Sequence, residues 1–219
     1  MAKSLERLLE SAPLFLEGLK NTVTLSLLGV LLGIVLGTVI TLFRLSKNKG
    51  LRAFAKAYVE LIRCTPLMIQ VFIVYFGFTA GFHVKISPYN AGLIALTINS
   101  AAYVSEIMRS GIESIDKGQF EASRSLGMNY AKTMRYIILP QAIKNILPAL
   151  CNEFVAVIKE TSTLTVIGVH ETMFNTNRVK ASTYMPIAPL IVAFFIYFVL
   201  TFTLSRAVAA LERRMKVSD

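Results

Sequence analysis

The sequence predicts an all-helical integral membrane protein with five membrane-spanning helices. Of its 219 residues, 54% are hydrophobic and only 16% are charged. Soluble domains average about 45–50% apolar and about 25% charged residues, so this chain is too apolar to be one of them. It is also too apolar to be disordered. Long stretches free of charge recur along the chain, and the basic residues gather between them with a strong bias.

Five segments are predicted to cross the bilayer. A helix rises 1.5 Å per residue and the hydrocarbon core is about 30 Å thick, so each span needs about 20 residues. The predicted spans are residues 21–43, 64–82, 86–105, 145–165 and 186–205. The fourth is the weakest, because Glu153 interrupts it and it must extend past Lys159 and Glu160. The segment before the first span is expected to form a short amphipathic helix on the membrane surface.

The basic residues predict the orientation of these spans. Sixteen Lys and Arg residues lie between spans one and two, between spans three and four, or after span five, and seven lie elsewhere. The richer side is expected to be cytoplasmic, which places the N-terminus outside and the C-terminus in the cytoplasm. Residues 1–219 then form a single transmembrane domain. Because this bias accounts for the net charge of +10 through contact with anionic lipid, no nucleic-acid partner is expected.

The sequence carries no recognisable enzyme motif. It has no phosphate-binding loop of the form G-x-x-x-x-G-K-[ST], no H-E-x-x-H and no G-x-S-x-G. Its histidines, His83 and His170, are far apart, and its cysteines, Cys64 and Cys151, cannot form a disulfide framework. We therefore expect no catalytic residue, metal site or cofactor in this chain.

Three glycines of the first span form a regular pattern. Gly29, Gly33 and Gly37 repeat every four residues, and such a ridge lets another helix approach closely. Packing against a helix of the same chain is favoured over a contact between subunits, because ridges of this kind are common in helical bundles.

Polar residues of the third and fourth spans are expected to lie at the same depth. Asn99 and Tyr103, four residues apart, share one face of the third span. Asn99 lies roughly 20 Å from the outer edge and Glu153 roughly 10 Å from the inner edge, and in a core of about 30 Å these depths coincide. A carboxylate inside a membrane favours a functional interpretation. Two interpretations stay open, a substrate pocket and a structural hydrogen bond between spans three and four.

The polar segment 106–144, between spans three and four, contains the most informative motif. Asp116 can cap a short helix that Gly127 ends, and a second helical pattern over 130–138 is predicted to break or kink at Pro140. The segment reads Glu121-Ala122-Ser123, three residues, Gly127, nine residues, then Ile137-x-Leu139-Pro140. This spacing resembles the EAA loop of ABC importer permeases, which is E-A-A, three residues, G, nine residues, I-x-L-P. Ser123 replaces the second alanine of that pattern.

Two other segments resemble the polar amino acid subfamily of these permeases. Arg63-Cys64-Thr65-Pro66-Leu67 is similar to its R-G-T-P-L segment, with Cys64 where glycine is common. Asn152-Glu153, followed by Lys159-Glu160-Thr161-Ser162, is similar to its fourth-span region. The resemblance covers nearly the whole chain, and it implies the type I (MetI-like) importer permease architecture.

The resemblance also implies partners and a role for each site. A loop helix docks on a separate ATPase dimer, which holds ATP and magnesium, and the coupling residues are Glu121, Ala122, Ser123, Gly127, Leu139 and Pro140. The substrate-binding candidates are Glu153, Asn99, Tyr103, Asn152 and Glu160. The other expected partners are a second permease, either a copy or a close relative, and an extracellular or periplasmic amino acid-binding protein. The expected location is the bacterial cell (inner) membrane, as a multi-pass protein.

The substrate is expected to be a basic amino acid. No basic residue lies in the charge-free stretches to neutralise Glu153, so a cationic side chain of arginine, lysine or histidine would do so. The alternatives are an importer of neutral polar amino acids such as glutamine, an ATPase-independent channel, or a structural membrane protein.

Overall fold

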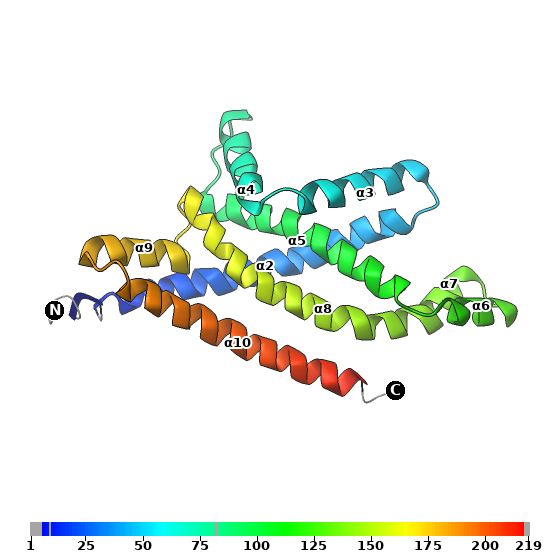
Figure 1. Ribbon diagram of the computed structural model, residues 1–219. Coiled ribbons are helices and arrows are strands. Elements are labelled where there is room, and N and C mark those ends of the chain that lie inside the picture. Colours follow the sequence, from blue (N-terminus) through cyan, green and yellow to red (C-terminus); the bar gives the residue numbers. More distant parts are fainter. Residues whose placement is uncertain (1–5, 9, 82, 217–219) are drawn as a thin grey trace.

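The computed structural model describes residues 6–8, 10–81 and 83–216, and these ranges are helical with no strand (Figure 1). The elements in chain order are α2 (Ala12–Leu45), α3 (Lys49–Arg63), α4 (Leu67–Phe76), the π turn η1 (Gly77–Gly81), α5 (Pro88–Glu113), α6 (Lys117–Ser125), α7 (Tyr130–Thr133), the π turn η2 (Met134–Ile138), α8 (Leu139–Glu160), the 3-10 helix η3 (Thr161–Ile167), α9 (Thr172–Thr183) and α10 (Ala188–Lys216). The chain is thus all-helical, as predicted.

Three helices of the described ranges are long and apolar enough to cross a membrane, namely those containing α2, α5 and α10. They correspond to the first, third and fifth predicted spans. The helix at the second predicted span, Leu67–Gly81, is short. It is long and apolar enough to cross a membrane only together with α3, from which it is bent by 107°. The fourth corresponds to α8, which has 22 residues but carries charges along its length. The structure therefore supports three spans, or four with the bent pair, and the count of five stays a prediction.

The end of the segment before the first span belongs to the spanning helix and not to a separate surface helix. Helix α2 begins at Ala12 and runs to Leu45, so residues 12–20 belong to the spanning helix itself. Pro13 does not interrupt it, because a proline is tolerated in the first helical turn, where its missing N–H would have no partner. Residues 1–5 and 9 lie outside the described residues.

Helices α2 and α5 form the centre of the fold, and the glycine ridge joins them. A Cβ at Gly29 would lie 3.2 Å from the Leu96 Cβ, and one at Gly33 would lie 2.9 Å from the Ser100 Cβ. At Gly37 the added atom would lie 2.7 Å from a Val104 methyl carbon. The ridge is therefore a contact within the chain, as favoured from the sequence.

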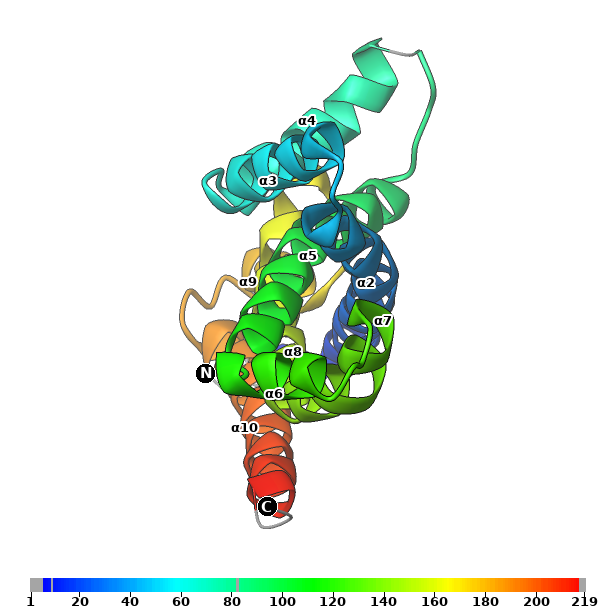
Figure 2. The same cartoon turned by 90° about the vertical axis from the view of Figure 1, so that its right-hand side faces the viewer.

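Other helices surround this pair. Figure 2 shows α3 and α4 on one side of the group formed by α2, α5 and α8, and α10 on the opposite side. The basic segment between the first and second predicted spans forms the helix α3, because Ala55, Val59 and Ile62 repeat at helical spacing and bury one face against α2 and α5. Asn48 caps it by accepting hydrogen bonds from the backbone N–H groups of Gly50 and Leu51. An apolar face with a good cap is enough to make this charged segment helical.

The sequence did not predict helix α9, which a buried carboxylate anchors. Glu171 is fully buried at its N-cap and accepts hydrogen bonds from the Met173 and Phe174 N–H groups at 2.8 and 2.6 Å. The Tyr197 hydroxyl of α10 donates a third bond at 3.0 Å. Burial raises the pKa of this carboxyl, and the backbone bonds oppose the rise. Glu171 therefore fixes α9 to α10.

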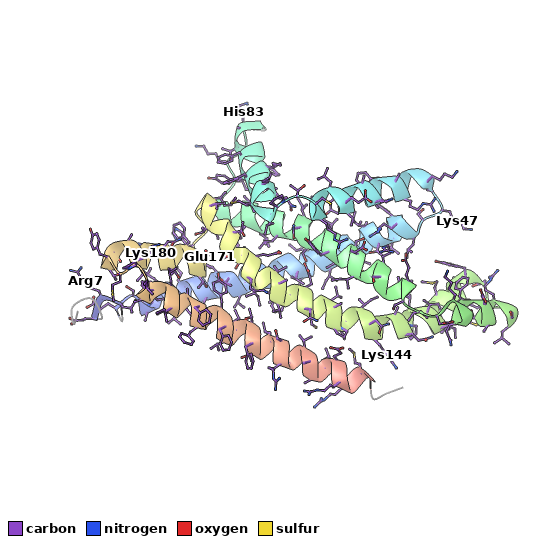
Figure 3. All side chains as sticks on the ribbon, in the orientation of Figure 1. Arg7, Lys47, His83, Lys144, Glu171 and Lys180 are labelled. Carbon is purple, nitrogen blue, oxygen red and sulfur yellow. The ribbon has the colours of Figure 1, made fainter. Side chains whose placement is uncertain are left out.

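Basic residues lie at both ends of the elongated molecule. Lys47 and Lys144 lie toward the end that carries α6, whereas Arg7 and Lys180 lie at the other end with α9 (Figure 3). These four residues, two from each of the groups that the sequence assigned to opposite membrane faces, are thus separated along the molecule.

Candidate coupling loop and translocation site

Helix α6 begins and ends at the residues that the sequence predicted. The Asp116 carboxylate accepts a hydrogen bond from the Gly118 N–H at 2.6 Å. Gly127 has a φ of +77°, a conformation that glycine adopts without the steric cost of a Cβ. The Met128 N–H bonds to the Ser123 carbonyl at 3.1 Å and the Gly127 N–H to the Arg124 carbonyl at 3.0 Å. This pair of bonds is the Schellman motif, which ends the helix sharply.

The predicted coupling residues divide between an outer and an inner face of α6. Glu121 and Ala122 are exposed, and so is Leu126, at 83%. Ser123 points inward, where its hydroxyl contacts the Thr133 hydroxyl at 3.1 Å. The residue that departs from the EAA pattern therefore ties α6 to α7. The outer face offers an acid and an apolar side chain to a partner.

Pro140 does not break the helix that precedes it. The π turn η2 leads directly into α8, and the Leu139 N–H bonds to the Met134 carbonyl, five residues back. A proline in a regular helix would clash with the carbonyl four residues before it, and the wider π turn accommodates the ring. Leu139 and Pro140 are both exposed. The coupling loop is thus joined to α8 by an uninterrupted run of helical backbone.

Two carboxylates of α8 approach α5 around Tyr103. Both Glu153 and Glu160 lie within electrostatic reach of Tyr103. The guanidinium of Arg63 lies over the Tyr103 ring, 5.4 Å from its centroid. The structure therefore brings together Tyr103, Glu153 and Glu160, and adds Arg63, to which the sequence assigned no role.

Asn99 and Asn152 make other contacts. Asn99 is 4% exposed, and its amide donates to the Gln70 side chain of α4 at 3.0 Å. Gln70 in turn donates to the Ile62 and Thr65 carbonyls. The hydrogen bond of Asn99 thus links the second and third predicted spans, not the third and fourth. Asn152 lines a different cavity, of about 360 Å³, which lies between α8 and the end of α10.

Charged side chains form a cluster beyond Tyr103, toward the C-terminal end of α5. Glu106 pairs with Arg109 at 2.5 Å, with Arg44 at 2.7 Å and with Arg63 at 3.7 Å. Arg109 also pairs with Glu113. The group joins α2, α3 and α5, and it contains one more arginine than glutamate. The sequence gives one sign of this cluster, which is that its residues lie near the ends of the charge-free stretches.

Comparison with known proteins identifies the family. The profile of the binding-protein-dependent transport system inner membrane component matches residues 29–217. This chain belongs to that family. It is therefore a permease subunit of an ABC transporter, and a partner ATPase, not this chain, hydrolyses ATP. The predicted family is confirmed, and with it the type I permease fold.

Individual relatives match over almost the whole chain. The arginine transport system permease protein ArtQ of Bacillus subtilis (strain 168) is 42% identical over 207 residues, which are 94% of each protein. The putative glutamine transport system permease protein GlnP of Rickettsia bellii (strain RML369-C) is 40% identical, over 92% of this chain and 93% of GlnP. Among solved structures, an amino acid ABC transporter crystallised with histidines matches with a TM-score of 0.92 and 44% identity, over 94% of this chain and 96% of the other.

Proposed function

We propose that this chain forms half of the translocation pathway of an importer for basic amino acids. The observation that carries the proposal is the pair of α8 carboxylates, Glu153 and Glu160, that lie within electrostatic reach of Tyr103. A carboxylate inside a membrane is costly unless a cation accompanies it. The α-ammonium and side-chain cation of arginine, lysine or histidine supply two such charges. The arginine permease among the relatives supports this choice.

The complete importer contains two permeases, two ATPase subunits and a binding protein. One permease chain cannot enclose a pathway alone, so a copy or a close relative of this chain completes it. The exposed face of α6, with Glu121, Ala122 and Leu126, docks on the ATPase. Motion of the ATPase then passes through η2 into α8 and so to Glu153. Alternating access follows when ATP and substrate favour different states of this bundle.

The proposed topology has five spans, with the N-terminus outside and the C-terminus in the cytoplasm of a bacterial cell. Helices α4 and α8 supply the second and fourth spans. The grouping of Lys47 and Lys144 toward the α6 end of the molecule supports this orientation. The loop that meets the ATPase then lies in the cytoplasm, where ATP is available.

A second candidate substrate is glutamine. The Rickettsia relative, a putative glutamine permease, is nearly as similar to this chain as the arginine permease is. A protonated Glu153 could donate a hydrogen bond to a neutral amide, so the same site would serve a neutral substrate.

Substitution of Glu153 distinguishes the two substrates. In proteoliposomes that hold the permease with its ATPase and binding protein, Glu153→Gln is expected to lower arginine-stimulated ATP hydrolysis at least tenfold. Glutamine-stimulated hydrolysis should change much less. Glu60→Gln is the matched control, because Glu60 is an exposed carboxylate of α3. An equal loss for both substrates, with assembly intact, would contradict the basic substrate.

A further inference from the structure

The charge of Arg63 is the least neutralised in the cluster of charges around Glu106. Arg63 is the last residue of α3, and its side chain is 41% exposed. Its distance to Glu106, 3.7 Å, is the longest of the three ion pairs that this carboxylate makes. Because Arg44 and Arg109 already hold Glu106 closely, the pair with Arg63 contributes little, and its guanidinium can accept another anion.

The position of Arg63 links its charge to the proposed substrate site. Its guanidinium lies 5.4 Å from the centre of the Tyr103 ring, and Tyr103 lies within electrostatic reach of Glu153 and Glu160. Arg63 also lines a cavity of about 500 Å³ together with Glu106, Ser110 and Asn145. The guanidinium of Arg63 therefore borders both an open space and the ring of Tyr103.

We infer that Arg63 binds the α-carboxylate of the transported amino acid. This inference rests on the proposed function, because it takes the group around Tyr103 as the substrate site. An amino acid carries one carboxylate and one ammonium group, and a basic side chain adds a second cation. One guanidinium and two carboxylates are the complement of that charge pattern. A planar guanidinium can hold a carboxylate by two parallel N–H···O bonds, which fixes its orientation as well as its charge.

The same contact would give a form of selectivity that Glu153 cannot give. Every amino acid has the α-carboxylate, whereas amines and amides with the same side chain lack its charge. Arg63 is then the residue that restricts the pathway to amino acids, and Glu153 is the residue that selects among their side chains. The two roles can be separated by ligands that differ in one group.

The test compares each amino acid with its own amide. Binding of radiolabelled arginine to the purified permease–ATPase complex in nanodiscs is measured in competition with arginine and with argininamide, which keeps both cations and loses the carboxylate. Glutamine and glutaminamide are compared in the same way. A charge-assisted contact predicts that the unsubstituted complex prefers the acid by about 10- to 100-fold. Arg63→Gln should remove this preference by weakening the binding of the acid alone, and Arg63→Lys should retain part of it.

Arg44→Gln is the matched control, because it removes a closer partner of Glu106 without removing the guanidinium at Tyr103. It should leave the preference for the acid unchanged. The inference about Arg63 is overturned, and the proposed function is kept, if an amino acid binds but Arg63→Gln and Arg63→Lys keep the full preference for the acid. The same conclusion follows if Arg44→Gln removes this preference equally. If the unsubstituted complex binds neither arginine nor glutamine, the proposed site itself is wrong and the inference falls with it. If the complex prefers the acid over its amide only for glutamine, the result supports the role of Arg63 and refutes a basic substrate.

Discussion

Adding one methyl group at each glycine of α2 should produce a graded loss of stability. Alanine improves the helix propensity by about 1 kcal/mol, whereas overpacking a tight contact costs about 1–3 kcal/mol. At Gly29 the new Cβ meets the Leu96 side chain at 3.2 Å, and at Gly33 it meets Ser100 at 2.9 Å. At Gly37 it lies 2.8 Å from a backbone carbonyl oxygen, which cannot move aside easily.

The net effect is therefore expected to differ at each position. Gly29→Ala should be nearly neutral, Gly33→Ala should cost about 1 kcal/mol and Gly37→Ala about 2 kcal/mol. For a protein of this size the last value corresponds to a fall in melting temperature of about 4–8 °C. The assay is the fraction of purified protein in detergent that survives heating, followed by size-exclusion chromatography.

A matched control lies in another helix. Gly77 has a φ of −60° and no atom within 4 Å of an added Cβ, so Gly77→Ala should not lower the melting temperature. If Gly37→Ala melts at the same temperature as Gly77→Ala, or if Gly29→Ala is the most harmful, then the ridge is not the close contact between α2 and α5 that we describe.

Three further predictions concern the loop, the topology and α9. Gly127→Val should uncouple substrate from ATP hydrolysis while the protein still inserts, because a β-branched residue at this positive φ is strained. Gly127→Asn should retain more coupling. Equal activity of both variants would contradict the role of this cap. In a cysteine-free background, a cysteine at position 85 should react with an impermeant reagent from outside and one at position 117 should not, and the reverse would refute the orientation. Glu171→Ala should cost about 1–3 kcal/mol of stability by leaving buried donors unpaired, whereas Glu171→Gln should cost less; an unchanged melting temperature for the alanine variant would show that α9 does not depend on this cap.

Local sequence signals predicted the coupling loop well. Asp116 and Gly127 bound α6 as expected, because caps and a positive φ depend on a few adjacent residues. Of the break or kink predicted at Pro140, the break does not occur, because η2 continues directly into α8. The rule for proline assumes a regular α-helix, and the π turn before it removes the clash.

The polar site was predicted less well, because the depth of a residue along its helix and the direction of its side chain depend on different quantities. Depth follows from the rise of 1.5 Å per residue, which the sequence supplies, whereas direction depends on a rotation of about 100° per residue and on which neighbour each face meets. Glu153 therefore approaches α5 while the adjacent Asn152 lines a cavity beside α10. Asn99 turns toward Gln70 instead.

The sequence by itself determined that the chain is a helical membrane protein, where its apolar stretches lie, which permease family it resembles and how its coupling loop is capped. These properties follow from composition and from spacings within a few turns of one segment. Only the tertiary structure decided that the glycine ridge meets α5, that Glu171 is buried against Tyr197, and that Arg63 lies over Tyr103. Each of these contacts joins residues at least 26 positions apart, and which helix faces meet is set by the packing of the whole bundle.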